Sequence, residues 1–199
     1  MKTRTGAILA GILVIACVLP EPCLGNELES WYTYWGGGFA QNTYPDELEE
    51  TLDLLEDTAG VDHFAMGLDI LGFYWPRDEQ TLWGGVISGS IDTYEVAGFE
   101  ADISNYLYAF SAMRFLTNRI GQGPFVRADV GFARHAGDVK TTGSELSTTS
   151  DWGTGLLLGA GYGIPVTEGT RILLNGSYAI KRVEGDVTET VRISVGGLF

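Results

Sequence analysis

Few residues of this chain could carry out covalent chemistry, and the most obvious candidates are its two histidines. A hydrolase needs a nucleophile, a base within hydrogen-bond reach and an acid that orients the base. His63 and His135 fall near the ends of strand-like segments. The serines that could serve as nucleophiles are Ser88, Ser90, Ser104 and Ser150. No histidine and serine stand close together on one segment, so we expect no catalytic residue, and a lipid-modifying hydrolase is the less favoured alternative.

A run of carboxylates between residues 47 and 62 is the next candidate, because a divalent cation could bind there. Its members are Glu47, Glu49, Glu50, Asp53, Glu56, Asp57 and Asp62. Their spacing does not match a calcium-binding loop. A solvated acidic helix explains them better, and the sequence predicts no metal site and no cofactor.

Five further charged residues recur within the strand-like segments and share one face with Gly, Ser and Thr. They are Asp69, Arg127, Asp129, Lys181 and Arg192. If this face lines the interior of a narrow barrel, unpaired charges there would be costly. We therefore predict a structural network of ion pairs in the lumen. A gated narrow pore is the alternative.

Apolar residues recur with a period of two around these charges, and this period is typical of strands. We therefore expect strands to position the charges. Eight segments near barrel-spanning length show this pattern. They cover residues 31–44, 63–75, 82–91, 102–116, 125–136, 151–164, 171–182 and 187–199. Between the first two segments, Pro45 is followed by Leu48, Leu52 and Leu55, which are spaced to lie on one face of a helix. This pattern predicts a short amphipathic helix over residues 46–57. Residues 92–100 are expected to be a connection, and residues 137–150 a loop of Gly, Ser and Thr.

The last strand has the clearest facing. Val191, Ile193, Val195 and Phe199 alternate with more polar residues, which directs them to lipid and directs Arg192 to the lumen. We predict that Val195 and Phe199 form a C-terminal signal for the barrel assembly machinery. The segments 31–44 and 102–116 carry aromatics on both faces, so their facing stays open.

Tryptophans gather near the strand ends that would face the periplasm. Amphipathic rings favour the membrane–water interface, so Trp31, Trp75 and Trp83 are predicted to be interface aromatics. Trp35 fits either the same belt or the core.

The composition supports an exported barrel. The chain of 199 residues has a net charge of −14, 28 glycines and only 19% charged residues. This acidity argues against nucleic acid as a partner. Residues 1–25 read as a signal peptide, which leaves one domain over residues 26–199 and cleavage before Asn26. Cys17 in a lipobox-like context is the alternative mature N-terminus, and both cysteines, Cys17 and Cys23, lie in this segment.

A soluble eight-stranded barrel of the lipocalin kind would also be exported and acidic, but its apolar face points inward. Here the charges share faces with small residues, while the opposite faces are apolar. The sequence therefore predicts an all-β fold: an eight-stranded antiparallel up-and-down transmembrane β-barrel, with a short helix in the first external loop.

Three glycine- and aromatic-rich stretches carry a family resemblance: residues 123–132, 155–165 and 191–199. They resemble the bacterial outer-membrane β-barrel domain family of small porin-like proteins. The resemblance implies the outer membrane as location, and lipid, lipopolysaccharide and the assembly machinery as partners of a monomer. It carries over no catalytic residue. We expect a non-catalytic structural, adhesive or surface-interaction role. A narrow conduit for small apolar solutes is the alternative, and a lipid A-modifying hydrolase is a less favoured one.

Overall fold

The computed structural model describes residues 29–56, 60–96 and 98–199, and the predicted signal peptide, with Cys17 and Asn26, lies outside them. Within these described ranges, nine strands and one helix follow one another. They are β1 (Tyr32–Thr43), α2 (Asp46–Glu56), β2 (Asp62–Pro76), β3 (Thr81–Val96), β4 (Phe99–Phe115), β5 (Gly123–Thr141), β6 (Ser144–Thr149), β7 (Gly153–Pro165), β8 (Arg171–Val183) and β9 (Asp186–Leu198). No helix among the described residues is long and apolar enough to cross a membrane.

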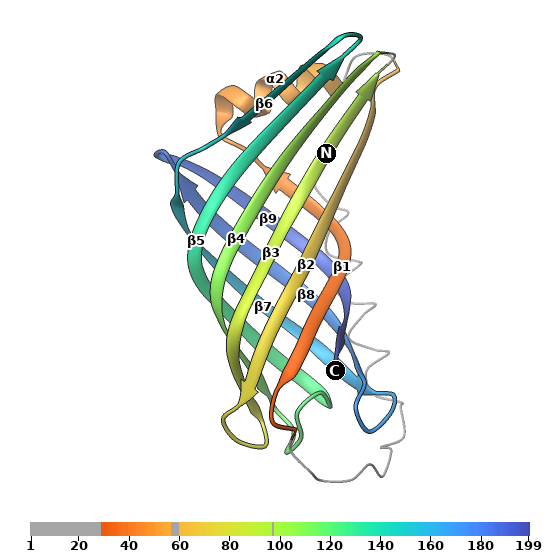
Figure 1. Cartoon of the computed structure of the whole chain (residues 1–199), viewed down its shortest axis with the longest axis vertical. Helices are drawn as coiled ribbons and strands as arrows, with labels where there is room; N and C mark the ends of the chain where they lie inside the picture. The colour runs from red at the N-terminus through yellow and green to blue at the C-terminus, as the bar shows by residue number, and fades with distance from the viewer. Residues whose placement is uncertain (1–28, 57–59, 97) are drawn as a thin grey trace, which may run out of the picture.

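Eight of the strands close into an antiparallel barrel, as predicted (Figure 1). From β1 to β6 each strand pairs with the next one in sequence. β5 also pairs with β7, β7 pairs with β8 and β8 with β9, and β9 closes the ring against β1. Closure leaves no unpaired edge within the membrane. Phe199 completes it, because its backbone N–H and C=O both pair with Thr33 at 2.9 Å.

The two ends of the barrel differ in their connections. At the end where the C-terminus lies, short turns join β2 to β3, β4 to β5 and β7 to β8 (Figure 1). Short turns of this kind are periplasmic in bacterial barrels. The opposite end, which is then external, carries α2, β6 and the tips of the longest strands (Figure 1).

The external end contains more strand than the sequence predicted. Residues 92–100 were expected to be a connection, yet β3 runs to Val96 and β4 starts at Phe99. Residues 137–150 were expected to be a loop, yet β5 runs to Thr141 and turns back as β6. β6 is exposed throughout and the outer part of β5 is at least partly exposed on both faces, so these stretches lack the apolar alternation by which a strand is recognised.

A β-bulge in β2 also departs from the predicted pattern. The register shifts between Asp69 and Leu71 against both β1 and β3, so β2 carries one extra residue. Ile70 and Leu71 consequently both face outward. The outward-facing residues of β2 are therefore even-numbered up to Ile70 and odd-numbered from Leu71 onward.

The structure assigns the facing that the sequence left open. Tyr32 and Tyr34 of β1 are buried in the lumen, and Trp35 points outward. In β4, Leu107, Ser111 and Met113 are buried, whereas Tyr108 and Phe110 are exposed on the outer surface. A core position for Trp35 is therefore wrong: its ring is exposed and stacks on Phe199, with 5.9 Å between ring centroids.

The outward surface is apolar over the height of the barrel. Leu, Ile, Val and aromatic side chains are exposed there on every barrel strand, Val130, Leu158, Ile193 and Val195 among them. An exposed apolar band of this extent suits lipid rather than water. The distribution is the reverse of a soluble ligand-binding barrel, whose apolar face points inward.

Candidate functional site

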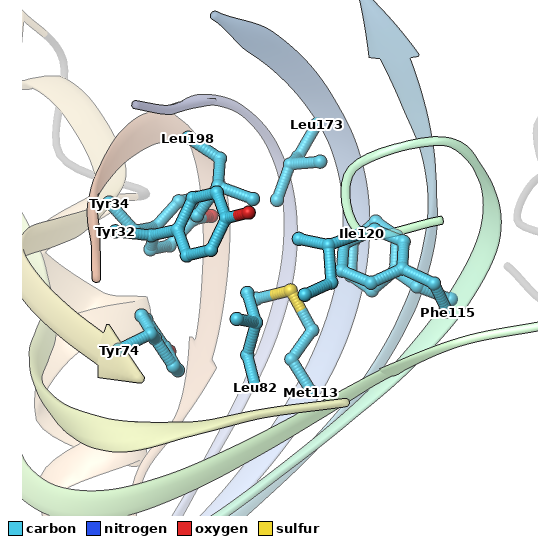
Figure 2. Close-up of a cluster of buried hydrophobic side chains, with 10 residues drawn as sticks. Tyr32, Tyr34, Tyr74, Leu82, Met113, Phe115, Ile120, Leu173 and Leu198 are labelled. Carbon is cyan, nitrogen blue, oxygen red and sulfur yellow. The ribbon is translucent and has the colours of Figure 1, made fainter. Parts of the chain in front are cut away.

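Packed side chains fill the lumen, among them an apolar plug at the periplasmic end, a charged layer, a polar layer and a second apolar cluster of Leu107, Ala133, Leu157, Ala179 and Val183. Figure 2 shows the side chains of the plug converging from opposite walls of the barrel. Its members are Tyr32, Tyr34, Tyr74, Leu82, Met113, Phe115, Ile120, Phe125, Leu173 and Leu198. An eight-stranded barrel is just wide enough for side chains to fill it. The plug therefore separates the rest of the lumen from the periplasmic side.

A charged layer lies next to the plug and contains four of the five predicted lumen charges. Arg127 holds Asp69 at 3.0 Å and Asp129 at 2.7 Å, and Arg192 holds Asp69 at 3.0 Å. All four side chains are at most 4% exposed. Two guanidinium groups thus face two carboxylates, which leaves the layer electrically balanced.

Neutral partners complete this layer. Tyr34 donates its hydroxyl hydrogen to Asp69 at 3.0 Å, and Arg192 donates to the backbone oxygen of Leu68 at 3.1 Å. Ser111 donates to Asp129 and lies 2.8 Å from the hydroxyl of Tyr74. Bidentate arginine–carboxylate pairs with additional hydrogen bonds are the arrangement in which buried charges are tolerated.

Lys181 lies apart from these ion pairs. It is buried in β8, and among the described residues no carboxylate lies within 4.0 Å of its ammonium group. Its nitrogen lies 3.3 Å from Thr190 Oγ1, and Thr190 donates to Asn42. Asn42 in turn donates to Asp92 at 2.9 Å. Lys181 is therefore linked to a carboxylate only through two neutral side chains.

Asp92 is the centre of a third, polar layer near the external end, which the sequence analysis missed. Tyr44 and Asn42 donate to its carboxylate, and His63 Nε2 lies 3.5 Å from it. Asn105 donates to the Tyr44 hydroxyl at 3.1 Å. The alternation of Ser88, Ser90 and Asp92 with outward-facing residues of β3 points to this layer, but the predicted strand 82–91 ends one residue before Asp92.

The histidines and serines considered for hydrolysis do not form a relay in the described part of the chain. His63 lies beside Asp92 and stacks on Tyr94, with ring centroids 4.4 Å apart. The ring nitrogens of His135 make no hydrogen bond with the described residues. Ser150 accepts from the backbone N–H of His135 and donates to a backbone oxygen.

Besides the Trp35–Phe199 pair, two further groups of aromatic residues lie on the outer surface. Trp31, Trp75 and Trp83 are all exposed at the periplasmic end, where Trp75 pairs with Trp83 in register. Trp152 forms a second contact group with Tyr108 and Arg134. Trp152 lies in the segment 151–164 that the sequence predicts to be a strand, and β7 begins at the next residue, Gly153.

A sheet extension rises from one side of the external end (Figure 1). It consists of the outer parts of β3, β4 and β5 together with β6. β5 pairs with β7 as far as Ala133 and with β6 from Ala136, so it forks between two partners. β6 is the last strand of the sheet, and all six of its residues are exposed. No other strand among the described residues pairs with its outer edge, whose backbone groups can donate and accept hydrogen bonds.

The external end is strongly acidic. Exposed or partly exposed carboxylates lie on α2, on the sheet extension and on the β8–β9 turn: Asp46, Glu49, Glu50, Asp53, Asp62, Glu95, Glu100, Asp102, Asp138, Glu145, Glu184 and Asp186. The predicted carboxylates Glu47 and Glu56, by their side chains, and Asp57 lie outside the described part. No group of three or more ligands in the described residues could hold a metal ion.

Few basic groups oppose these carboxylates. Lys140 lies 3.1 Å from Glu100, whose hydrogen bond and negative charge raise the pKa of Lys140 above its usual value. Arg134 donates to the backbone oxygen of Ser150 and covers Trp152. Neither group cancels the charge of the whole end.

The fold has clear relatives among solved structures. One is the attachment invasion locus protein Ail of Yersinia pestis, at 15% identity and a TM-score of 0.52, matching 86% of this chain and 100% of that one. A second Ail structure, with the heparin analogue sucrose octasulfate, gives a TM-score of 0.53 at 15% identity with the same coverage. Neisserial surface protein A matches 85% of this chain and 96% of its own at 16% identity, with a TM-score of 0.51.

No family model matches the sequence, and no curated protein matches it significantly. At these identities the likeness to solved structures is one of fold. The chain thus has the fold of small eight-stranded bacterial outer-membrane β-barrels, and its apolar outer band fits it to that membrane.

Proposed function

We propose that this barrel has a non-catalytic role at the cell surface, in which its external sheet extension binds another macromolecule. The observation that carries the proposal is the free edge of β6, held beyond the barrel by the long strand β5. Free strand edges pair with extended segments of other chains. Nothing in the closure of the barrel requires β6, since the ring is complete without it.

The filled lumen supports a role at the surface over transport. The apolar plug, the charged layer and the polar layer occupy successive levels of the interior. A conduit would need these side chains to move apart and separate buried charges from their partners, which is costly.

The charge of the external end indicates the chemistry of the partner. Its carboxylates greatly outnumber its basic groups, so a cationic surface would be attracted and an anionic one repelled. Ail has been crystallised with a heparin analogue, which is a polyanion. The described residues of the external end carry far more carboxylates than basic groups, which disfavours sulfate groups as a ligand there. A basic, extended polypeptide fits both the edge and the charge.

The test uses the barrel in lipid nanodiscs and a synthetic peptide of alternating lysine and valine. In the shortened variant, residues 138–147 are removed and an Asn-Gly turn joins Gly137 to Thr148, which face each other in register. We expect the intact protein to bind the peptide and the shortened variant to lose most of the binding, measured by fluorescence anisotropy.

The control variant carries Asn-Gly in place of Glu184-Gly185, a two-residue turn at the same end with positive φ at both residues. It should bind like the intact protein. A peptide of alternating glutamate and valine should not bind. Equal binding by the shortened variant would refute the role of the β6 edge.

A further inference from the structure

The outer wall of the barrel contains an apolar groove on its periplasmic half. It has a volume of about 450 Å³ and lies over β2, β3 and β4. Leu71, Phe73 and Trp75 form one side, Tyr108 forms the other, and Ile87 closes it above. Gly85 forms the floor, because it stands between two aromatic positions, Phe73 on β2 and Phe110 on β4.

The groove exists because Gly85 has no side chain. A Cβ built at this position would meet nothing nearer than the backbone oxygen of Ala109 at 3.9 Å. The adjacent outward positions are large, with Trp83 on one side and Ile87 on the other. A single glycine in a row of bulky residues therefore leaves a hollow in the lipid-facing surface.

The position of the groove matches one leaflet of the membrane. Trp75 and Trp83 mark the periplasmic interface, since amphipathic rings favour that depth. From Trp83 to Ile87 the strand advances about 13 Å at roughly 3.3 Å per residue. Half of the hydrocarbon core is about 15 Å thick. Because the strands of such barrels tilt by about 35–45°, this length covers about 10 Å of depth, so the groove lies within the periplasmic leaflet and can take part of one acyl chain.

Charged side chains lie beyond the Trp75 end of the groove, in the β2–β3 turn and at the adjacent end of β4. Arg77 places its guanidinium 4.6 Å from the ring centroid of Trp83, and Arg114 extends from the adjacent end of β4 toward Gln80. No described carboxylate lies within 4.0 Å of either guanidinium. Asp78 and Glu79, exposed in the same turn, bring two negative charges to this region.

We infer that this groove is a binding site for one glycerophospholipid of the periplasmic leaflet, with a phosphoethanolamine headgroup. One acyl chain lies over Gly85, between Phe73 and Tyr108. The phosphate takes hydrogen bonds from Arg77 and Arg114, as guanidinium groups favour. The ammonium group faces Asp78 and Glu79. Two positive and two negative side chains match a zwitterionic headgroup, which is why this lipid fits better than an anionic one.

Native mass spectrometry of the purified barrel with dioleoyl phosphatidylethanolamine tests the site. Gly85→Val fills the groove, and lipid retention should fall about tenfold, a change of about 1.4 kcal/mol. The matched control is Gly176→Val on β8, an outward glycine whose Cβ would also meet only a backbone oxygen at 3.9 Å. It should retain the lipid like the unaltered protein.

The headgroup contacts are tested separately with Arg77→Ala combined with Arg114→Ala. These residues are exposed at the turn, so this variant remains informative even if Gly85→Val fails to fold. Retention should fall here too. If both variants keep as much lipid as the Gly176→Val control, the site does not exist. The same spectra also show whether the unaltered protein forms a dimer. If Gly85→Val abolishes such a dimer and leaves lipid retention unchanged, a second copy of the chain occupies the groove and the proposal is overturned.

Discussion

Arg127 is the side chain on which the balance of the charged layer depends. It alone contacts both Asp69 and Asp129, and all three groups are buried. Removing a buried charge costs more than the pair contributes, because its partners stay behind without compensation. The sequence could identify this network from facing alone, but it could not show that Lys181 stays outside it, since that depends on distances across the lumen.

Arg127→Ala should destabilise the barrel by about 3–5 kcal/mol, because Asp129 would lose its only ion-pair partner among the described residues. Urea unfolding in lipid vesicles, with tryptophan fluorescence as readout, measures the change. Arg182→Ala serves as control, because Arg182 is exposed at the external end. Its effect should stay within about 0.5 kcal/mol. Similar effects of the two substitutions would argue against the network.

The neighbouring glycines of β3 make a second prediction at this scale. A Cβ on Gly84 would lie 1.8 Å from the backbone oxygen of Phe73, whereas one on Gly85 would have open space. Gly84→Ala should therefore cost about 1–3 kcal/mol through forced backbone shifts. Gly85→Ala should change stability by less than about 0.5 kcal/mol. The same unfolding assay compares them, and equal costs would contradict the close approach of β2 and β3.

Among the elements, β5, β7, β8 and β9 were the most predictable. Each separates the packed lumen from lipid along its barrel-spanning part, so buried and exposed residues alternate along it. The bulge at Ile70 hid the facing of the second half of β2. The hairpin of β5 and β6 was missed because Ser144–Thr149 is exposed throughout. Such a strand is held by backbone pairing, and its side chains carry no pattern.

β9 yields a prediction about assembly. Phe199 pairs with Thr33, stacks on Trp35 and covers Gly197, whose added Cβ would meet the Phe199 ring at 2.4 Å. We expect Phe199→Ala to slow barrel closure and lower the amount of folded protein in the outer membrane. Quantitative blotting of membrane fractions measures this amount. Val187→Ala, at the other end of β9, should leave it unchanged, and an equal loss in both would remove the special role of the C-terminal residue.

At the scale of the whole molecule, a closed ring of hydrogen bonds around a packed interior should resist detergent. We expect the unheated protein to migrate faster in a dodecyl sulfate gel than the boiled protein, because the compact barrel survives until heating opens it. The shortened β6 variant should behave alike, since β6 lies outside the ring. Identical migration before and after boiling would contradict the closed barrel.

The packed lumen predicts a result for transport. In planar bilayers the purified protein should show no stepwise conductance, because the apolar plug closes the periplasmic end. Leu82→Ala combined with Met113→Ala removes side-chain volume from the plug. This variant tests whether the packing of these side chains blocks the passage of ions. Stable conductance steps from the unaltered protein would favour the conduit.

The fork in β5 has a mechanical consequence. One continuous strand runs from the periplasmic turn at Gly123 to the tip at Thr141, and β6 is attached alongside its outer part. A load applied outward along β6 would act parallel to the strands, so the hydrogen bonds of the β5–β6 ladder would share it in shear. From there the force would pass down the β5 backbone into both of its barrel neighbours. A pull on the extension would thus be spread over the wall of the barrel before it reaches the lipid.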